Sequence, residues 1–422
     1  FLERVDLDAL KALEPERLRA EVRRLIQRLM EEPGWTFNAQ ERLRVVVDLE
    51  NEVLGLGPLE PLIQDAEVSD ILVNRCDQVY VERKGRLELS TVRFDDNDHL
   101  RRVIERIVSR VGRRVDESSP MVDARLADGS RVNAVIPPLA LDGPALSIRK
   151  FAREPMTLQR VLALGSLTRE MALLLQAMVR ARLNILISGG TGSGKTTLLN
   201  ILSASIPEEE RLLTIEDAAE LQLQQPHVVR LETRPANIEG EGEVNQRSLL
   251  RNALRMRPDR IILGEVRGNE AFDMLQAMNT GHEGSMATVH ANTARDALMR
   301  VENMVSMGSS AMSSRVARQQ IASALHVVIQ VQRLSDGSRR LTHVSEVTGL
   351  EGDVVMMQDL FVFDQTGVDV QGQVVGQFRA TGVRPHLEGR LRSRGQVLPQ
   401  GLFDPLRTVD IHAEGHLSTG GL

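Results

Sequence analysis

Residues 189–197 read GGTGSGKTT and match the pattern G-x-x-x-x-G-K-[ST] without exception. Glycines at these positions let backbone N–H groups point inward around phosphate oxygens, next to the positive end of a helix. Lys195 would reach the β- and γ-phosphates of a nucleotide, and the Thr196 hydroxyl would bind Mg²⁺. The chain has only four lysines, so a chance match has odds of roughly one in several hundred. The sequence therefore predicts a site for ATP and Mg²⁺ whose nucleotide-binding residues include Gly189, Gly190, Thr191, Gly192, Ser193, Gly194, Lys195, Thr196 and Thr197.

Other short apolar runs also end in polar side chains. The run 212–215 leads into Glu216 and Asp217, the run 260–263 leads to Glu265, and the run 286–289 leads into His290, with His282 just upstream. In open parallel sheets, ligands bind outside the carboxyl ends of the strands. Each cluster also has a structural interpretation, as a helix cap or a buried imidazole. Their joint occurrence beside one phosphate loop favours a catalytic site.

The two glutamates are candidates for the same chemistry. A carboxylate at Glu265 could accept a proton from water in line with the γ-phosphate, or hold a Mg²⁺-bound water. Glu216 offers a second carboxylate on a neighbouring strand. We take Glu265 as the general base, and we expect Thr196, Glu216 and Glu265 around the metal ion.

A phosphate that leaves during hydrolysis needs positive charge beside it. Arg125 and Arg131 flank a predicted turn at Asp128-Gly129, and Arg149 lies at the predicted junction between two domains. Arginine is abundant in this chain, so the structural alternative is a solvated surface.

The elements that must position these residues fall into four predicted segments. Residues 1–64 contain charged amphipathic helices over 13–31 and 39–54, and residues 65–150 mix β-like runs with a helix whose apolar face is Leu100, Val103, Ile104, Ile107, Val108 and Val111. Residues 151–350 alternate helices with fully apolar strands, which indicates a parallel sheet covered on both faces. A hairpin at Asp336-Gly337 closes this domain. We expect residues 351–422 to form a small appendage with a loose tail after about Asp404.

Composition excludes several classes of protein. The 422 residues carry a net charge of −6 and only one tryptophan and one tyrosine, so nucleic-acid binding is not favoured. A single cysteine excludes a disulfide scaffold and a multi-cysteine zinc site. No apolar stretch is long enough to span a membrane. The sequence begins with Phe1 rather than Met, so we expect it to be part of a longer chain.

Together the motifs resemble a known family. GGTGSGKTT, TIEDAAEL, RPDRIILGEVRG and GHEGSMATVHAN resemble the Walker A, Asp, Walker B and His boxes of the type II/type IV secretion ATPase superfamily. The Walker B box is atypical, with Gly264 where many P-loop enzymes carry Asp. The segments TRPANIEGEGEVNQRSLLRNALRMRPDR, RLADGSRVNAVIPP and SIRKF resemble its CpaF-type branch, the motors of Tad/Flp pili. The resemblance covers roughly residues 50–380.

This resemblance implies a RecA-like P-loop ATPase domain preceded by a small α+β (PAS-like) domain and a helical segment. It implies a homo-hexamer that binds ATP between these two domains and receives Arg125, Arg131 and Arg149 from the same or a neighbouring subunit. It assigns Glu216 and Asp217 to the Asp box and His282 and His290 to the His box, with His290 as the γ-phosphate contact or sensor. It also places Asp217 and His282 among the nucleotide-binding residues. Such motors engage inner-membrane platform proteins at the cytoplasmic face and so associate with the membrane through partners. The single cysteine departs from relatives that carry a tetracysteine zinc module.

Other functions remain as alternatives at this point. Within the same superfamily, the second candidate is a VirB11-type traffic ATPase of type IV secretion. A RecA-like nucleic-acid translocase would need basic channel loops and aromatic stacking platforms. The last alternative is a nucleotide switch that does not hydrolyse ATP. In such a protein, Glu265→Gln would leave ATP turnover essentially unchanged.

Overall fold

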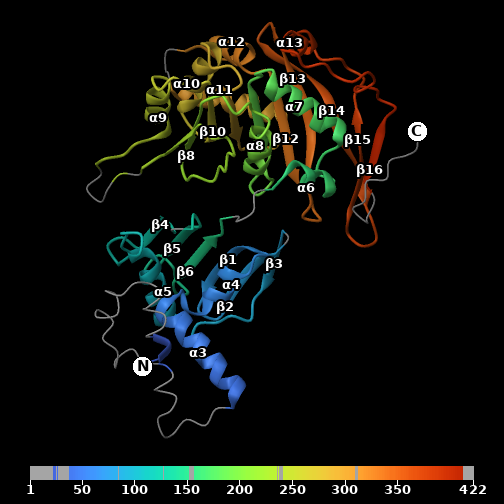
Figure 1. The fold of residues 1–422 in the computed structure, drawn as a ribbon. Helices are drawn as coiled ribbons and strands as arrows, with labels where there is room; N and C mark the ends of the chain where they lie inside the picture. Colours follow the sequence, from blue (N-terminus) through green and yellow to red (C-terminus); the bar gives the residue numbers. More distant parts are fainter. Residues whose placement is uncertain are drawn as a thin grey trace. The chain divides into compact units, whose positions relative to one another are not determined.

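The structure is a computed structural model that describes residues 22–24, 26, 38–83, 85–126, 128–151, 156–234, 236, 241–308 and 312–411. The chain divides into two compact units, Phe1–Ala152 and Arg153–Leu422, here called unit 1 and unit 2. Figure 1 shows the fold coloured along the sequence. Within the described residues, no helix is both long enough and apolar enough to cross a membrane.

Helix α3 (Ala39–Leu54) has the bounds predicted from its pattern. It begins with a capping box, in which Asn38 accepts a hydrogen bond from the Glu41 amide and Glu41 accepts one from the Asn38 amide. The predicted helix over 13–31 falls largely outside the described residues. Of its apolar side chains, Val22 and Ile26 are buried against α3.

One antiparallel sheet forms the centre of unit 1. Among the described residues it has six strands in the order β3-β2-β1-β6-β5-β4. Their bounds are β1 (Val68–Arg75), β2 (Gln78–Arg83), β3 (Arg86–Leu89), β4 (Met121–Arg125), β5 (Arg131–Val135) and β6 (Ala145–Arg149). The elements η2 (Gly57–Leu59) and α4 (Glu60–Gln64) precede it. Helix α5 (Asn97–Ser109) packs on the sheet with all of the predicted apolar positions except Val111, which lies beyond its end.

The predicted division between residues 64 and 65 is not a boundary between compact units. Glu52 of α3 lies 3.0 Å from His99 Nε2 and accepts a hydrogen bond of 3.0 Å from Arg106 Nη2, both on α5. These partly buried contacts join the helical segment to the α+β fold. Both segments therefore belong to unit 1.

Unit 2 is built on a larger sheet. Among the described residues it has ten strands in the order β16-β15-β14-β13-β12-β7-β11-β10-β8-β9. The run from β12 to β9 is parallel, and β13 to β16 add antiparallel strands at one edge. The bounds are β7 (Ile185–Gly189), β8 (Leu212–Glu216), β9 (Val228–Glu232), β10 (Arg260–Val266), β11 (Met286–Val289), β12 (Val327–Arg333), β13 (Arg339–Glu351), β14 (Val354–Val368), β15 (Val374–Ala380) and β16 (Thr408–Ile411).

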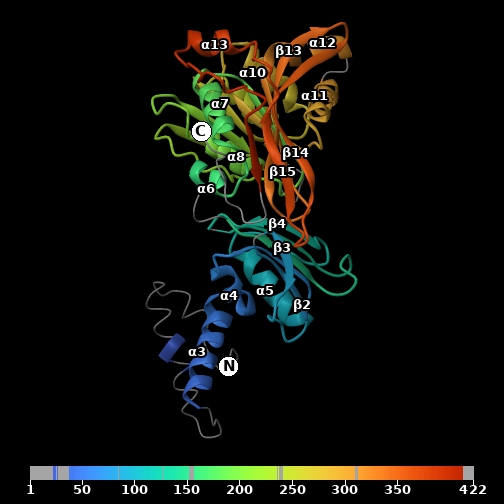
Figure 2. The ribbon, with the colours of Figure 1, turned by 90° about the vertical axis from the view of Figure 1, so that its right-hand side faces the viewer.

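Helices cover both faces of this sheet, as predicted. One core contains side chains of α6 (Leu158–Ala163), α7 (Arg169–Arg180), α8 (Lys195–Ser203) and α13 (Glu388–Ser393). The other contains side chains of α9 (Gln246–Ala253), α10 (Glu270–Asn279), α11 (Ala294–Gly308) and α12 (Ser314–Ala324). Figure 2 shows α7 and α8 on one side of the strands and α11 and α12 on the other. This is the α/β architecture of a RecA-like P-loop domain.

The prediction of a separate appendage over 351–422 is wrong for the described residues. The predicted boundary falls at the end of β13, and β14, β15 and β16 continue the same sheet by hydrogen bonding in series. In β15, buried side chains alternate with less buried ones, which is the period of a strand packed on one face. Residues 405–411, expected to be a loose tail, include β16.

Candidate active site

The phosphate-binding loop connects β7 to α8. Gly189 ends β7, and a Cβ there would lie 2.3 Å from the carbonyl oxygen of Val331 on β12, so only glycine fits. Gly192 and Gly194 have φ angles of 68° and 99°, in the left-handed region that favours glycine. Gly194 is the N-cap of α8. The loop therefore has the backbone form and the helix N-terminus that bind anions.

The Lys195 side chain is hydrogen-bonded to the backbone of this loop. Its side chain is buried, and Nζ donates a hydrogen bond of 3.0 Å to the carbonyl oxygen of Gly190. Ser193 Oγ donates to the same oxygen at 2.9 Å. Thr196 and Thr197 follow in the first turn of α8, whereas Thr191 lies exposed in the loop. The predicted residues Gly189 to Thr197 therefore form one continuous segment from the end of β7 to the first turn of α8.

Glu216 explains the glycine that stands where many P-loop enzymes carry Asp. Glu216 ends β8 and is buried, and a Cβ on Gly264 of the adjacent β10 would lie 2.8 Å from Glu216 Cγ. Glu216 Oε2 accepts hydrogen bonds from the amides of Glu220 and Leu221. Oε1 is buried with no hydrogen-bond partner among the described residues. Burial raises the pKa of Glu216 to about 6, although the two amide donors oppose the shift.

Glu265 lies at an irregularity in the sheet. The register of β10 and β11 shifts between Leu263 and Val266, which places an extra residue on β10. A bulge of this kind re-aims a side chain. Glu265 accepts a 3.0 Å hydrogen bond from Arg267 Nη2 and lies 3.4 Å from His290 Nδ1. The predicted base and the predicted sensor thus meet at the carboxyl ends of adjacent strands.

The charges at this end of the sheet are coupled. Burial favours a higher pKa for Glu265, but Arg267, His290 and Lys195 together lower it below its ordinary value. Burial and the charge of Lys195 lower the pKa of His290, against the opposing effect of Glu265. Glu265 is therefore ionised and His290 neutral near neutral pH, so His290 can donate one hydrogen bond and accept another.

The residues present fit a Mg²⁺ ion. Glu216 Oε1 is a buried carboxylate oxygen that lacks a partner among the described residues, and Thr196 offers a hydroxyl in the first turn of α8. No group of three or more His, Cys, Asp or Glu side chains within the described residues could hold a metal ion. Mg²⁺ in nucleotide sites is held by few protein ligands, with water and phosphate oxygens completing its shell. Of the three predicted ligands, Thr196 and Glu216 would hold it here, whereas Glu265 is engaged by Arg267 and His290.

Two predicted residues are not brought to the loop. Asp217 lies 3.4 Å from Arg267 Nη1 and accepts a hydrogen bond from Thr233, so it orients Arg267. His282 precedes β11 at the amino end of the sheet, whereas His290 follows β11 at the carboxyl end. The four residues of β11 span about 13 Å, so in this subunit the prediction that His282 binds nucleotide is not met.

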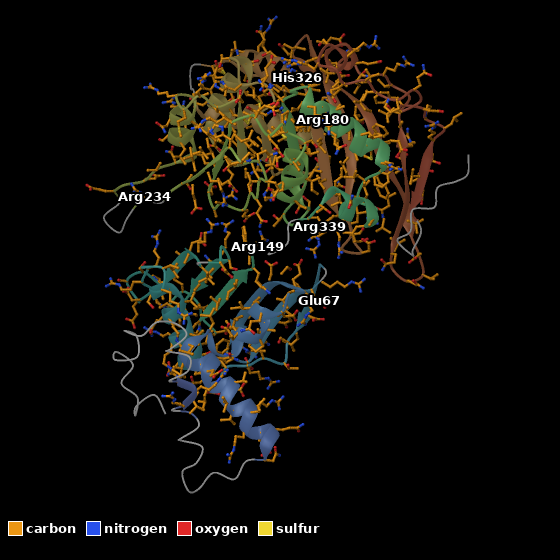
Figure 3. The ribbon with its side chains drawn as sticks, in the orientation of Figure 1. Glu67, Arg149, Arg180, Arg234, His326 and Arg339 are labelled. Atoms are coloured by element: carbon orange, nitrogen blue, oxygen red, sulfur yellow. The ribbon has the colours of Figure 1, made fainter. Side chains whose placement is uncertain are left out.

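The three predicted arginines of unit 1 form a row. Arg125 pairs with Arg131 across β4 and β5, and Arg131 pairs with Arg149 across β5 and β6. Residues directly opposite in antiparallel strands share a face, so all three side chains lie on one face of the sheet. Arg149 also donates to Asp70 at 3.2 Å and is labelled in Figure 3. Lys150, which follows Arg149, donates to the carbonyl oxygens of Leu62 and Asp65.

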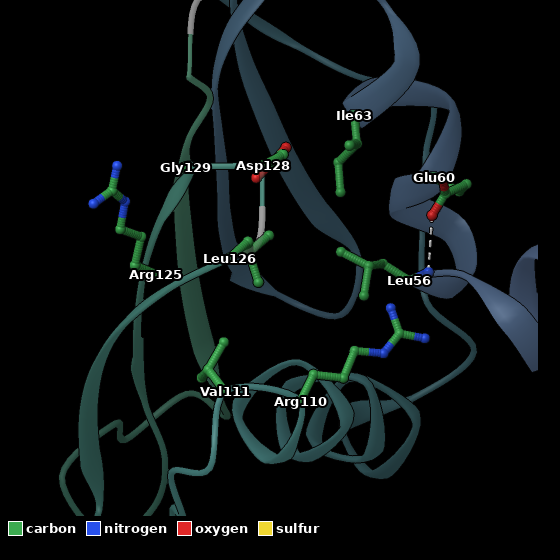
Figure 4. Close-up of a pocket in the computed structure, with 9 residues that line it drawn as sticks. All are labelled: Leu56, Glu60, Ile63, Arg110, Val111, Arg125, Leu126, Asp128 and Gly129. Carbon is green, nitrogen blue, oxygen red and sulfur yellow. Dashed lines mark hydrogen bonds between the residues drawn. The ribbon is translucent and has the colours of Figure 1, made fainter. Parts of the chain in front are cut away.

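Unit 1 also contains a cavity of about 560 Å³ beside this hairpin. Its walls are Leu56, Glu60, Ile63, Arg110, Val111, Arg125, Leu126, Asp128 and Gly129. Figure 4 shows that the Arg125 side chain points away from Leu56, Ile63 and Leu126. The guanidinium of Arg125 therefore belongs to the arginine row rather than to the apolar part of this cavity.

Sequence reasoning missed two kinds of contact. Arg267 belongs to the Walker B motif but was assigned no role from the sequence. In the structure its guanidinium contacts both Glu265 and Asp217. Arg339 of the β12–β13 hairpin donates from Nε to the Gly192 carbonyl oxygen at 2.9 Å. The turn at Asp336-Gly337 was the available signal for this hairpin, but its position beside the loop depends on how β12 pairs with β7.

Comparison with known proteins agrees with this arrangement. Residues 52–375 match the model of the family described as Type II/IV secretion system protein. The chain belongs to this family. A putative conjugal transfer protein of Mycobacterium tuberculosis (strain H37Rv) is 41% identical over 312 residues, which cover 72% of this chain and 88% of that protein.

More distant relatives extend the comparison. The type IV secretion system protein VirB11 of Bartonella quintana is 30% identical over 328 residues, which cover 68% of this chain and 91% of that protein. The solved structure of the ATPase DotB from Yersinia pseudotuberculosis is 19% identical and covers 75% of this chain and 81% of that chain, with a TM-score of 0.50. That structural likeness supports the fold. Membership of the Type II/IV secretion family makes this protein an ATPase, so the non-hydrolysing switch is set aside.

Proposed function

We propose that this protein is a hexameric ATP-hydrolysing motor that acts at the cytoplasmic face of the inner membrane and powers assembly of a Tad/Flp type IV pilus. The observation that carries the proposal is the presence of two complementary half-sites. Unit 2 holds the phosphate loop, Glu216, Glu265 and His290, and unit 1 holds three arginines in one row.

Each half-site has a distinct task. The loop amides and Lys195 bind the β- and γ-phosphates, and the Glu265 carboxylate accepts the proton of the attacking water. Neutral His290 contacts the γ-phosphate and so reports its presence to β11. Mg²⁺, when bound through Thr196 and Glu216, neutralises charge on the phosphates.

The arginine row supplies the remaining positive charge. Guanidinium groups bind phosphate oxygens in a planar, bidentate way, and three of them on adjacent strands match a charge spread over several oxygens. We assign Arg125, Arg131 and Arg149 to the γ-phosphate of ATP held by a neighbouring subunit. Hydrolysis would then change how two subunits are held together, which is the physical basis of a rotary motor.

A second candidate follows from the relatives. The Mycobacterium tuberculosis relative is named a conjugal transfer protein and the Bartonella quintana relative a type IV secretion protein. The same chemistry would serve a traffic ATPase that passes substrates to a secretion channel. The pilus branch is preferred because the insert over 232–260 and the helices before residue 55 resemble it.

Assembly is tested by trapping the ATP state. Glu265→Gln should bind Mg²⁺ and ATP without turnover and give the mass of a hexamer by light scattering. A monomeric mass under these conditions would contradict the proposal. Asp353→Asn, at a side chain that is 66% exposed, is the control that should behave like the wild type.

The two biological roles are separated in cells. A strain that carries only Glu265→Gln should lose surface pili while substrate transfer to recipient cells is unaffected. Loss of transfer with normal pili would favour the traffic ATPase. Membrane fractions with and without the platform proteins test whether membrane association depends on partners.

A further inference from the structure

The β12–β13 hairpin extends beyond the strand that carries the phosphate loop. β12 pairs in parallel with β7 from Val327/Ile185 to Val331/Gly189, where β7 ends. β12 continues for two more residues to Arg333, which lies directly opposite Arg339 of β13. Both arginines are exposed and lie on the part of the hairpin that extends past the last residue of β7.

Both side chains contact the loop region. Arg339 Nε donates a 2.9 Å hydrogen bond to the Gly192 carbonyl oxygen, across 147 residues of sequence. Its Cδ would lie 3.4 Å from a Cβ on Gly194. Arg333 Nη1 would lie 3.5 Å from a Cβ on Gly192. The two guanidinium groups therefore approach the backbone that turns its N–H groups toward phosphate. Arg339, the first residue of β13, is labelled in Figure 3.

A guanidinium binds phosphate oxygens through directed N–H donors. The cross-strand Arg333/Arg339 pair thus has the charge and the geometry of a phosphate-binding wall beside the loop.

Hydrogen bonds to other parts of unit 2 fix the position of this hairpin. Asp336 in its turn accepts hydrogen bonds from the Ser338 amide at 2.8 Å and from the Val374 amide at 2.9 Å. Arg340, next to Arg339, is buried and donates to the Leu164 carbonyl oxygen. These bonds fix the strand that presents Arg339, so the ordering cost of a contact with phosphate is small.

We propose that Arg333 and Arg339 bind the phosphate chain of the nucleotide in the same subunit's loop and set how tightly ADP is retained after hydrolysis. This inference rests on the proposed nucleotide site. It gives the two arginine groups separate roles: the row in unit 1 acts on the γ-phosphate, whereas the hairpin pair acts on the phosphates that remain in the product.

The test is the affinity of the full chain for ADP, measured by titration calorimetry with Mg²⁺. Arg333→Gln and Arg339→Gln should each weaken ADP binding about tenfold, since each removes a charge-assisted contact. AMP binding should change less than ADP binding. Arg315→Gln, at an arginine of α12 that is 77% exposed, is the matched control.

Further measurements separate a phosphate contact from support of the loop. Arg333→Gln keeps the Arg339–Gly192 hydrogen bond, so weaker ADP binding with an unchanged unfolding midpoint supports the proposal. ADP affinity of the double variant within twofold of the wild type would overturn it. A loss of ADP affinity that always accompanies a lower unfolding midpoint would also overturn it. Lys195→Ala distinguishes failure of the site itself, because unchanged ADP affinity in that variant would contradict nucleotide binding in the loop.

Discussion

The two ends of the parallel sheet in unit 2 both carry ionisable side chains, but they hold them differently. At the carboxyl end, Glu216 keeps an oxygen without a partner among the described residues, and Glu265 is shared by Arg267 and His290. At the amino end, Arg260 is fully buried and donates to both oxygens of Glu210, at 2.6 and 2.9 Å. A charged side chain therefore does not by itself indicate a catalytic site, and the hydrogen bonds that it makes must be considered as well.

The amino end is a structural network. Arg260 Nη1 also donates to the Val179 carbonyl oxygen at 2.7 Å. His326 accepts a hydrogen bond from the Asn184 amide at 2.9 Å, and burial together with Arg390 lowers its pKa to about 4. His326 is thus neutral throughout the physiological range. These groups join the starts of the strands, whereas the groups at the carboxyl end remain available to a ligand.

The largest expected effect is at the carboxyl end. Glu265→Gln removes the proton acceptor while preserving the size of the side chain, so ATP turnover should fall about a thousandfold. ATP affinity should stay close to that of the wild type, because Lys195 and the loop amides are intact. Steady-state hydrolysis and equilibrium binding measured on the same preparation check this. Turnover above a tenth of the wild-type rate would remove Glu265 from the role of base.

The counterpart at the amino end affects stability instead. Arg260→Met leaves Glu210 buried beside Arg182 alone, and we expect a loss of about 3 kcal/mol in the free energy of unfolding, measured with urea. The double variant Arg260→Met/Glu210→Leu should recover most of that loss. ATP affinity of the folded protein should not change. Weaker ATP binding without lower stability would contradict the division between the two ends.

The two histidines on either side of β11 test the same comparison between the amino and carboxyl ends of the sheet. His290→Ala should lower ATP turnover about a hundredfold, because it removes a hydrogen-bonding group beside Glu265. His282→Ala should leave turnover at the wild-type rate, since His282 lies at the amino end. Equal losses in the two variants would show that His282 reaches a nucleotide, for instance one in another subunit.

Glu216 gives the smallest expected effect, which depends on pH. Its pKa is raised to about 6 from 4.5, so the folded state binds the proton more tightly than the unfolded state. This contribution to stability is fully present below the unfolded-state pKa and is lost as the pH rises through about 6. Relative to Glu216→Gln, the wild type should lose about 2 kcal/mol between the two limits. Urea unfolding of both proteins across this range, without nucleotide or Mg²⁺, is the measurement, and parallel curves would contradict the shift.

Much of the fold is local in origin and could be predicted from sequence. The strands β7, β8, β10 and β11 are continuous apolar runs, and α5 shows a clear helical period. The phosphate loop is specified by glycines whose backbone angles no other residue adopts easily. These features do not depend on distant parts of the chain.

Other features depend on contacts between distant residues. The strand β14 was missed because register shifts opposite Gly349 of β13 and near Gly367 interrupt its pairing. The strand β15 was missed although buried side chains alternate along it, because its neighbour in the sheet was not recognised. The packing of Gly264 against Glu216, and of Arg339 against Gly192, follows from which strands are neighbours in the sheet. His282 was assigned by resemblance, and only the direction of β11 shows that it lies at the other end from Lys195.

The central claim is that the arginine row of one subunit completes the phosphate site of another. It is tested by mixing Lys195→Ala protein with Arg125→Ala/Arg131→Ala protein and measuring ATP hydrolysis. In mixed assemblies some sites combine an intact loop with intact arginines, so hydrolysis should exceed that of both parents. Activity that never rises above either parent, in samples shown by mass to be mixed, would contradict the shared site.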